Sequence, residues 1–132
     1  GVKTLSYAVN MAAQREAARR GAADVIFAGT DGLVLEAPTS SVVWWSDETL
    51  HTTPLGPSGI LGGTTQQLLF ERAAAAGRRT ATTPVRVADL HAADSLWLIG
   101  SVRGPVDVVR LDGTPRGRDE TRTAEIRALC GF

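Results

Sequence analysis

The sequence predicts an α+β fold, in which a mostly antiparallel sheet is packed against helices. Short apolar stretches are separated by turn residues, which is typical of strands joined as hairpins. Longer stretches between them repeat apolar residues at helical spacing. The chain has 132 residues, which fits one domain with one hydrophobic core.

The first half of the chain alternates predicted helices and hairpins. Gly21 and Gly77 are natural C-terminal stops for the helices. The Asp31-Gly32 pair is a strong two-residue turn signal between two strands. In chain order, the expected elements are a helix over 5–20, strands over 24–29 and 33–36, strands over 42–45 and 49–53, and a helix over 64–76.

The second half adds more strands and a last helix. Residues 95–102 read SLWLIGSV and are the most strand-like run in the chain. The expected elements are a strand over 84–87, a helical turn or two over 88–94, strands over 95–102 and 105–113, and an amphipathic helix over 119–129. Hairpins interspersed with helices predict helices packed on an antiparallel sheet.

The composition argues against several classes of protein. Lys+Arg and Asp+Glu are equal at 14 each, which gives no support for nucleic-acid or anionic-membrane binding as the main role. No apolar run approaches the ~20 residues that span a bilayer. Cys130 is the only cysteine, so no internal disulfide is possible and a cytoplasmic location is expected. His51 and His91 have no metal-ligand spacing, so no metal site is predicted.

Each candidate for chemistry has an ordinary structural explanation when it is taken alone. Lys3 is the only lysine, but a lysine near a terminus is usually a solvated charge. Glu36 ends a predicted strand, where a glutamate usually lies on the surface. The Gly-Gly-Thr-Thr run at 62–65 could simply begin a helix, although the free N–H groups of a helix N-terminus do bind phosphate.

The order of these residues is more informative than any one of them. The chain reads KTLSY, then a strand ending in Glu36, then Thr-Ser-Ser, then GILGGTT before a helix, then WLIGSV and PVDVVRLDG. In this order and spacing the motifs resemble the C-terminal half of the class IV aminotransferase family, the fold-type IV pyridoxal-phosphate (PLP) enzymes. The resemblance covers about residues 2 to 128 and is nearest to aminodeoxychorismate lyases. It implies PLP as the cofactor.

The resemblance implies roles for three residues around the cofactor ring. Lys3 matches the lysine that forms a Schiff base with the cofactor aldehyde, which a neutral amine does well. Tyr7 matches a tyrosine that hydrogen-bonds the phenolic oxygen in some members, and helical spacing would place it on the face of Lys3. Glu36 matches the carboxylate that pairs with the pyridine nitrogen and keeps it protonated.

Two further segments resemble the parts of the family that hold the phosphate. Gly63, Thr64 and Thr65 match a cradle of backbone N–H groups at the start of a helix. Ser101 and Val102 match a second site, at a strand end, that approaches the phosphate and the substrate.

The chain also departs from the family pattern at these segments. Ser41 stands where the family has asparagine, and Gln66 stands where it has arginine, so an amide and a guanidinium are lost. Thr64 replaces isoleucine but keeps the backbone donor, so phosphate binding is expected to survive.

The resemblance leaves three functions open. The first is a lyase that converts aminodeoxychorismate to 4-aminobenzoate and pyruvate for folate synthesis, with Lys3 moving the proton. The second is an aminotransferase for branched-chain or D-amino acids, which uses the same residues. The third is an inactive domain with only a structural role.

The resemblance also implies partners. Residues 1–132 correspond to the cofactor-bearing C-terminal domain alone, whereas the family also needs an N-terminal domain that supplies much of the substrate pocket. The isolated chain is therefore expected to be inactive. A small-molecule amine substrate and a homodimer are expected for the intact enzyme.

Overall fold

The fold is organised around a five-stranded sheet with strand order β3-β2-β1-β4-β5. The computed structural model describes residues 6–132. The strands of this sheet are β1 (Ser41–Ser46), β2 (Thr49–Thr52), β3 (Arg79–Thr82), β4 (Ser95–Gly100) and β5 (Gly104–Asp107). The pairs β1–β2, β1–β4 and β4–β5 are antiparallel, while β2–β3 is parallel. The expected α+β fold with a mostly antiparallel sheet is confirmed.

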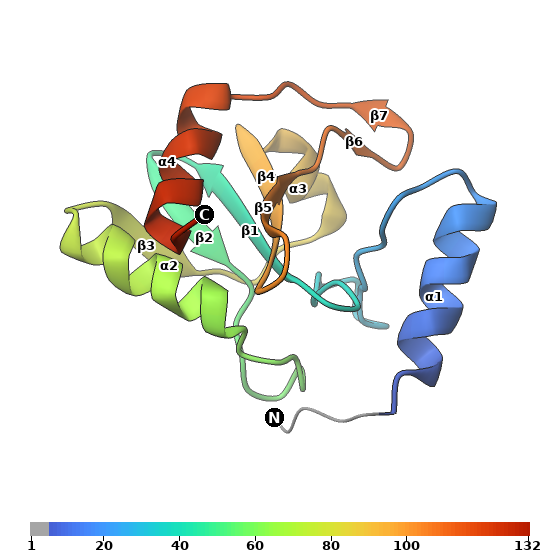
Figure 1. The fold of residues 1–132 in the computed structure, drawn as a ribbon. Coiled ribbons are helices and arrows are strands. Elements are labelled where there is room, and N and C mark those ends of the chain that lie inside the picture. The colour runs from blue at the N-terminus through green and yellow to red at the C-terminus, as the bar shows by residue number, and fades with distance from the viewer. Residues whose placement is uncertain (1–5) are drawn as a thin grey trace.

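Helices cover both faces of the sheet (Figure 1). They are α1 (Ala8–Arg19), α2 (Thr64–Ala75), α3 (Val87–Ala92) and α4 (Glu120–Cys130). A separate two-stranded hairpin is formed by β6 (Arg110–Leu111) and β7 (Thr114–Pro115). In the view of Figure 1, α2 and α4 lie on one side of the sheet and α3 lies on the other.

Strand β1 is buried on both faces and separates two apolar clusters. Val43 and Trp45 pack with residues of α2 and α4, including Leu69 and Ile126. The alternate side chains of β1 pack on the opposite face with α3 and with the segments that precede β1 and α3. Since successive side chains of a strand point to opposite faces, one apolar strand can serve both clusters.

The strand predicted at 84–87 is wrong, and β3 was not anticipated. Arg86 forms only an isolated bridge with Leu33, and Val87 already begins α3. The carboxylate of Asp89 accepts the Arg86 backbone N–H at 2.8 Å, which favours the start of a helix over a strand. The strand itself is Arg79–Thr82, which follows α2 and pairs with β2 in parallel. A parallel pair needs such a helical crossover, but short polar strands give little pattern in sequence.

The predicted hairpin around Asp31-Gly32 forms its turn but not a regular ladder. Gly32 has φ +80°, and the two segments are joined by the isolated bridge between Ala28 and Val34. Backbone hydrogen bonds from Phe27 N, Leu35 N and Gly29 N also cross between them. The return segment divides its hydrogen bonds among several partners, because the Val34 N–H donates to the Val85 carbonyl and Thr53 Oγ1 donates to the Leu35 carbonyl. Regular strands over 24–29 and 33–36 are therefore absent from this part of the described chain.

Helix α1 lies to one side of the sheet, beyond a long connection (Figure 1). Ala17 is its buried residue, and Asn10 Nδ2 donates to the Pro38 carbonyl at 3.0 Å. The helix begins at Ala8, with Tyr7 as its N-cap, so it is shorter than the predicted 5–20. Over residues 6–132, no helix combines the length and apolarity needed to cross a lipid bilayer.

Candidate active site

Of the two residues expected nearest the cofactor aldehyde, only Tyr7 is among the described residues. Lys3 lies outside the described residues. Tyr7 is half-buried and precedes α1, so this helix does not include it, contrary to the helical spacing expected from the sequence. Two residues later, Val9 lines the hollow that contains Glu36.

Glu36 is half-buried in a hollow of about 240 Å³. The hollow has mostly apolar walls, to which Phe27, Leu35 and Ile60 contribute. One carboxylate oxygen, Oε2, accepts the backbone N–H of Leu61 at 3.1 Å. Among residues 6–132 no arginine or histidine forms an ion pair with Glu36, and none of these residues donates a hydrogen bond to its second oxygen.

Burial raises the pKa of Glu36 above the ordinary value for a glutamate, and the Leu61 N–H lowers it by a smaller amount. The charged form is thus desolvated without a neighbouring cation among the described residues. A cationic ring nitrogen placed in this hollow would relieve that cost. The sequence expected a surface position for a glutamate that stands alone, and the structure instead gives it a partly apolar site.

The N-terminus of α2 presents unsatisfied donors. Its first backbone hydrogen bond runs from Gln67 N to Gly63 O at 2.9 Å, which leaves the N–H groups of the first turn without an acceptor inside the helix. The N-cap, Gly63, has no side chain that could accept them. Thr64 is exposed and Thr65 is buried at the start of this helix. Such a terminus suits an anion such as phosphate.

The segment 39–41 brings the two predicted phosphate-binding motifs together. A Cβ on Gly63 would lie 2.6 Å from Ser41 Oγ, so the glycine allows the serine hydroxyl to approach the N-cap of α2. A Cβ on Gly100 would lie 2.9 Å from the Thr39 carbonyl and 3.2 Å from Ser40 Oγ. The register of β1 and β4, with Ser41 opposite Ile99, produces this proximity.

Ser101 and Val102 lie in the exposed turn between β4 and β5, just beyond the predicted cradle. The predicted strand 95–102 ends earlier, at Gly100. The Val102 side chain is 90% exposed, and the next residue, Arg103, forms an ion pair with Asp24 at 3.1 Å. The structure therefore connects this turn to the cradle through Gly100 only, and the role expected for Val102 stays a prediction.

Sequence reasoning missed the Leu61 backbone and the serine hydroxyls. Leu61 acts through its N–H, which no residue type reveals, and Ser41 was noted only as a replacement for asparagine. Cys130 is not a candidate nucleophile, since burial raises its pKa to about 11. Among residues 6–132, no three His, Cys, Asp or Glu side chains gather where they could hold a metal ion.

Known proteins of similar sequence have related activities. A bifunctional aminodeoxychorismate lyase / D-amino acid transaminase from Mycobacterium tuberculosis is 48% identical, over 96% of this chain and 45% of that protein. An aminodeoxychorismate lyase from Bacillus subtilis is 33% identical, over 76% of this chain and 34% of that protein. The chain thus spans less than half the length of these relatives.

Solved structures agree with the sequence comparison. A hypothetical aminotransferase from Mycobacterium tuberculosis in its PLP-bound form superposes with a TM-score of 0.90 at 46% identity, over 98% of this chain and 45% of that one. A fold IV transaminase from Curtobacterium pusillum gives a TM-score of 0.90 at 43% identity, over 99% of this chain and 44% of that one. The model of the amino-transferase class IV family matches residues 1–111, and the chain therefore belongs to this family of enzymes.

Proposed function

We propose that this chain forms the cofactor-bearing domain of a PLP-dependent aminodeoxychorismate lyase, which releases 4-aminobenzoate and pyruvate for folate synthesis. The lyase names of two relatives, at 48% and 33% identity, support this choice. The observation that carries the cofactor assignment is the half-buried Glu36 carboxylate, which has no cationic partner among residues 6–132.

The described residues fit both ends of the proposed cofactor. Glu36 would hold the protonated ring nitrogen through the oxygen that Leu61 leaves available. The free N–H groups of Gly63, Thr64 and Thr65 would bind the phosphate at the start of α2. Ser101 would approach the phosphate from the end of β4, with Tyr7 near the phenolic oxygen. When bound, PLP supplies an electron sink for the pair released at the substrate's amine-bearing carbon.

The single lysine is the proposed proton carrier. Lys3 would hold the cofactor at rest and, once the substrate amine takes its place, would accept the proton from the amine-bearing carbon. As the bond to the enolpyruvyl oxygen breaks, the proton would pass to the departing group, which leaves as pyruvate, and the substrate ring becomes aromatic. The mostly apolar walls of the Glu36 hollow would pack against the cofactor ring, and the second domain proposed below would complete the exclusion of water.

A transaminase is the second candidate. The relative from Mycobacterium tuberculosis is named for both lyase and D-amino acid transaminase activity. A structure of an aminotransferase from the same organism contains α-ketoglutarate and PMP. Branched-chain amino acids are the other substrate class of this proposal. Lys3, Glu36 and the start of α2 serve either reaction, because both begin with proton removal at the same carbon.

We further propose that the chain needs a second domain and a second copy. It covers 45% of its Mycobacterium tuberculosis relative, and in this proposal a domain that corresponds to the rest of that length would add walls to the Glu36 hollow. In this proposal the intact enzyme is a homodimer in the cytosol, and residues 1–132 alone are inactive. A persistent absorbance band at about 410–430 nm when PLP is added to the isolated chain would overturn the need for a second domain.

Two assays on the intact protein test the proposal. One supplies chorismate, glutamine and the partner synthase and measures 4-aminobenzoate; the other supplies an amino acid and 2-oxoglutarate and measures the new keto acid. We expect the first to be positive and Lys3→Ala to abolish it, while Arg110→Ala, an exposed change on β6, leaves it intact. Keto acid alone would favour the transaminase. Turnover unchanged by Lys3→Ala would favour a structural role.

A further inference from the structure

We propose that a second hollow, between β5 and α4, binds a small organic carboxylate with a short apolar body. This hollow has a volume of about 370 Å³, and its lining comes from β5, from Val109 and Arg118, and from α4. No residue of it belongs to the Glu36 hollow.

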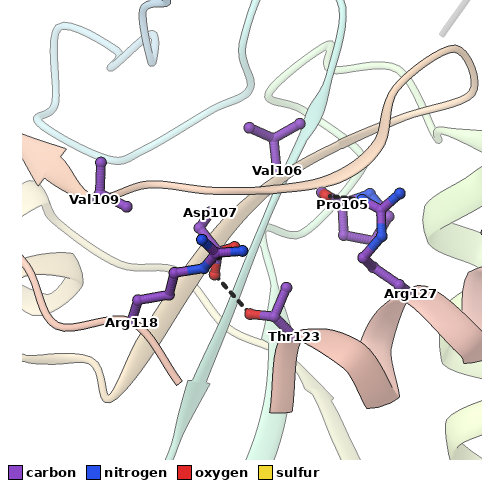
Figure 2. Close-up of a pocket in the computed structure, with 7 residues that line it drawn as sticks. All are labelled: Pro105, Val106, Asp107, Val109, Arg118, Thr123 and Arg127. Carbon is purple, nitrogen blue, oxygen red and sulfur yellow. Dashed lines mark hydrogen bonds and ion pairs between the residues drawn. The ribbon is translucent and has the colours of Figure 1, made fainter. Parts of the chain in front are cut away.

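Two guanidinium groups define the chemistry of this hollow. Figure 2 shows Arg118 and Arg127 on either side of the pair formed by Asp107 and Thr123. Arg118 precedes α4 and is exposed, whereas Arg127 lies in α4 and is half-buried. Against two arginines the lining has one acidic residue, Asp107, so the hollow carries an excess of one positive charge.

Each guanidinium is oriented by the protein and still has free donors. Arg127 Nη1 donates to the Pro105 carbonyl at 2.8 Å, and its guanidinium lies 5.9 Å from the centre of the Phe132 ring. Arg118 Nε is 3.1 Å from Asp107 Oδ2. No other hydrogen bond of these two groups occurs among residues 6–132, and a guanidinium has five N–H donors.

The acidic residue between the arginines is held by a buried chain of hydrogen bonds. Trp97 Nε1 donates to Thr123 Oγ1 at 3.0 Å, and Thr123 Oγ1 donates to Asp107 Oδ1 at 2.6 Å. Trp97 is fully buried, and the Asp107 side chain is 15% exposed. Thr123 therefore positions the Asp107 carboxylate, which in turn orients the Arg118 guanidinium. Such preorganisation lowers the entropy lost when a ligand binds.

An apolar side chain at the edge of the hollow selects the ligand class. Val109 lines the hollow and is 54% exposed, whereas the side chain of Val106 points away from Asp107 and Thr123 in Figure 2. A carboxylate accepts two parallel N–H bonds from a guanidinium, whereas an adjacent apolar group would cover Val109. A small carboxylic acid with an apolar body satisfies both surfaces, and inorganic anions or neutral analogues satisfy only one.

Titration of the full 132-residue chain with benzoate, followed by amide NMR, tests this proposal. We expect saturable shifts confined to residues 105–109 and 118–127, with weaker or no binding of benzamide and of inorganic sulfate. Sulfate that binds as well as benzoate would overturn the apolar part of the proposal. Absence of saturable benzoate binding would overturn the site.

Substitutions separate this hollow from the proposed cofactor site. Arg127→Gln and Arg118→Gln should each weaken benzoate binding about tenfold or more, because a hydrogen bond to a charged group is lost. Arg110→Gln, which lies outside the hollow, should have no effect. Loss of binding in Glu36→Gln but not in Arg127→Gln would place benzoate in the other hollow and overturn the proposal.

A further variant covers the case in which an arginine substitution prevents folding. Val109→Ser leaves both arginines in place, and Val109 is a 54% exposed side chain just beyond the end of β5. It should weaken benzoate binding and leave sulfate binding unchanged. Unchanged benzoate binding in this variant would overturn the apolar contact.

Discussion

The fold of the chain favours the protonated form of Glu36, whereas the proposed enzyme would favour the charged form. Burial raises its pKa in the folded chain, so the fold binds this proton more tightly than the unfolded chain does. The contribution of Glu36 to stability is therefore complete below its unfolded pKa and is lost as pH rises through the raised folded value. A cationic ligand would reverse the sign, because it stabilises the carboxylate.

Glu36→Gln should make the cofactor-free chain more stable than the parent at neutral pH and should remove the loss of stability on raising the pH. Glutamine carries no charge to desolvate and can still accept the Leu61 N–H. Urea unfolding at several pH values measures this. Glu71→Gln, at an exposed position of α2, is the control and should leave the profile unchanged. Parallel profiles for the parent and Glu36→Gln would contradict the role of burial.

In the intact protein the same substitution should have the opposite effect on PLP. Loss of a hydrogen bond to a charged group predicts roughly 10- to 100-fold weaker cofactor binding. Absorbance titration with PLP measures the dissociation constant. Equal affinity in the parent and in Glu36→Gln would remove Glu36 from the proposed site.

At the scale of elements, the start of α2 depends on close packing against β1. Gly63 has φ −65°, a backbone that any residue can adopt, so its importance comes from space and not from conformation. A methyl group there would meet Ser41 Oγ at 2.6 Å, so the serine side chain would have to rotate.

Gly63→Ala should destabilise the chain by roughly 1–2 kcal/mol through overpacking. Addition of Ser41→Ala should restore part of the loss, because it removes the oxygen that the new Cβ meets at 2.6 Å. Denaturant unfolding of both single variants and the double variant gives the coupling. Gly117→Ala, with no atom within 4 Å of its new Cβ, is the control. Additive effects would show that the two positions do not touch.

Arg116 joins the β6–β7 hairpin to the C-terminus of α3. Its Nη1 donates to the Leu90 carbonyl at 2.6 Å and the His91 carbonyl at 3.0 Å, and its Nη2 donates to the Ala93 carbonyl at 2.7 Å. Burial lowers the pKa of Arg116, but the carbonyls of His91 and Ala93 are acceptors that a helix end leaves free.

Arg116→Ala should lower the free energy of unfolding by roughly 2–4 kcal/mol, because it leaves helix-end carbonyls without a donor. Arg116→Lys should recover only part, since an ammonium lacks the planar fork of a guanidinium. Chemical denaturation measures both variants. Arg110→Ala on the same hairpin has no such contacts and serves as the control. If Arg116→Ala matched that control, the hairpin would not depend on this anchor.

At the scale of the whole molecule, the sheet with α2, α3 and α4 forms the packed body, and α1 contributes little to it. Val9 and Met11 of α1 are 74% and 48% exposed, and Ala17 is its buried residue. A helix of 12 residues is marginal in water without tertiary packing.

Backbone amides of α1 should therefore exchange with deuterium faster than those of β1 and β4 in the isolated chain. Protection of α1 should increase in the intact protein if the rest of the enzyme covers Val9. Hydrogen exchange followed by mass spectrometry measures both. Equal protection of α1 and β4 in the isolated chain would show that α1 belongs to the packed body.

The sequence by itself determined the fold class, the four helices near their observed positions and the order of the cofactor motifs. Apolar periodicity and glycine stops are local signals, which explains why β1, β4 and α2 were predicted almost to their ends. The polar strand β3 and the irregular segment around Asp31-Gly32 were not predicted. Their conformations depend on hydrogen-bond partners that are distant in the sequence.

Only the tertiary structure decided what surrounds the site residues. The Leu61 N–H on Glu36, the Ser41 hydroxyl beside Gly63 and the packing of Gly100 against Thr39 all join segments far apart in the chain. The hollow between β5 and α4 likewise forms between segments that are separate in the sequence. Sequence spacing records which residue types are present, whereas burial and hydrogen-bond partners depend on how strands pair and helices pack.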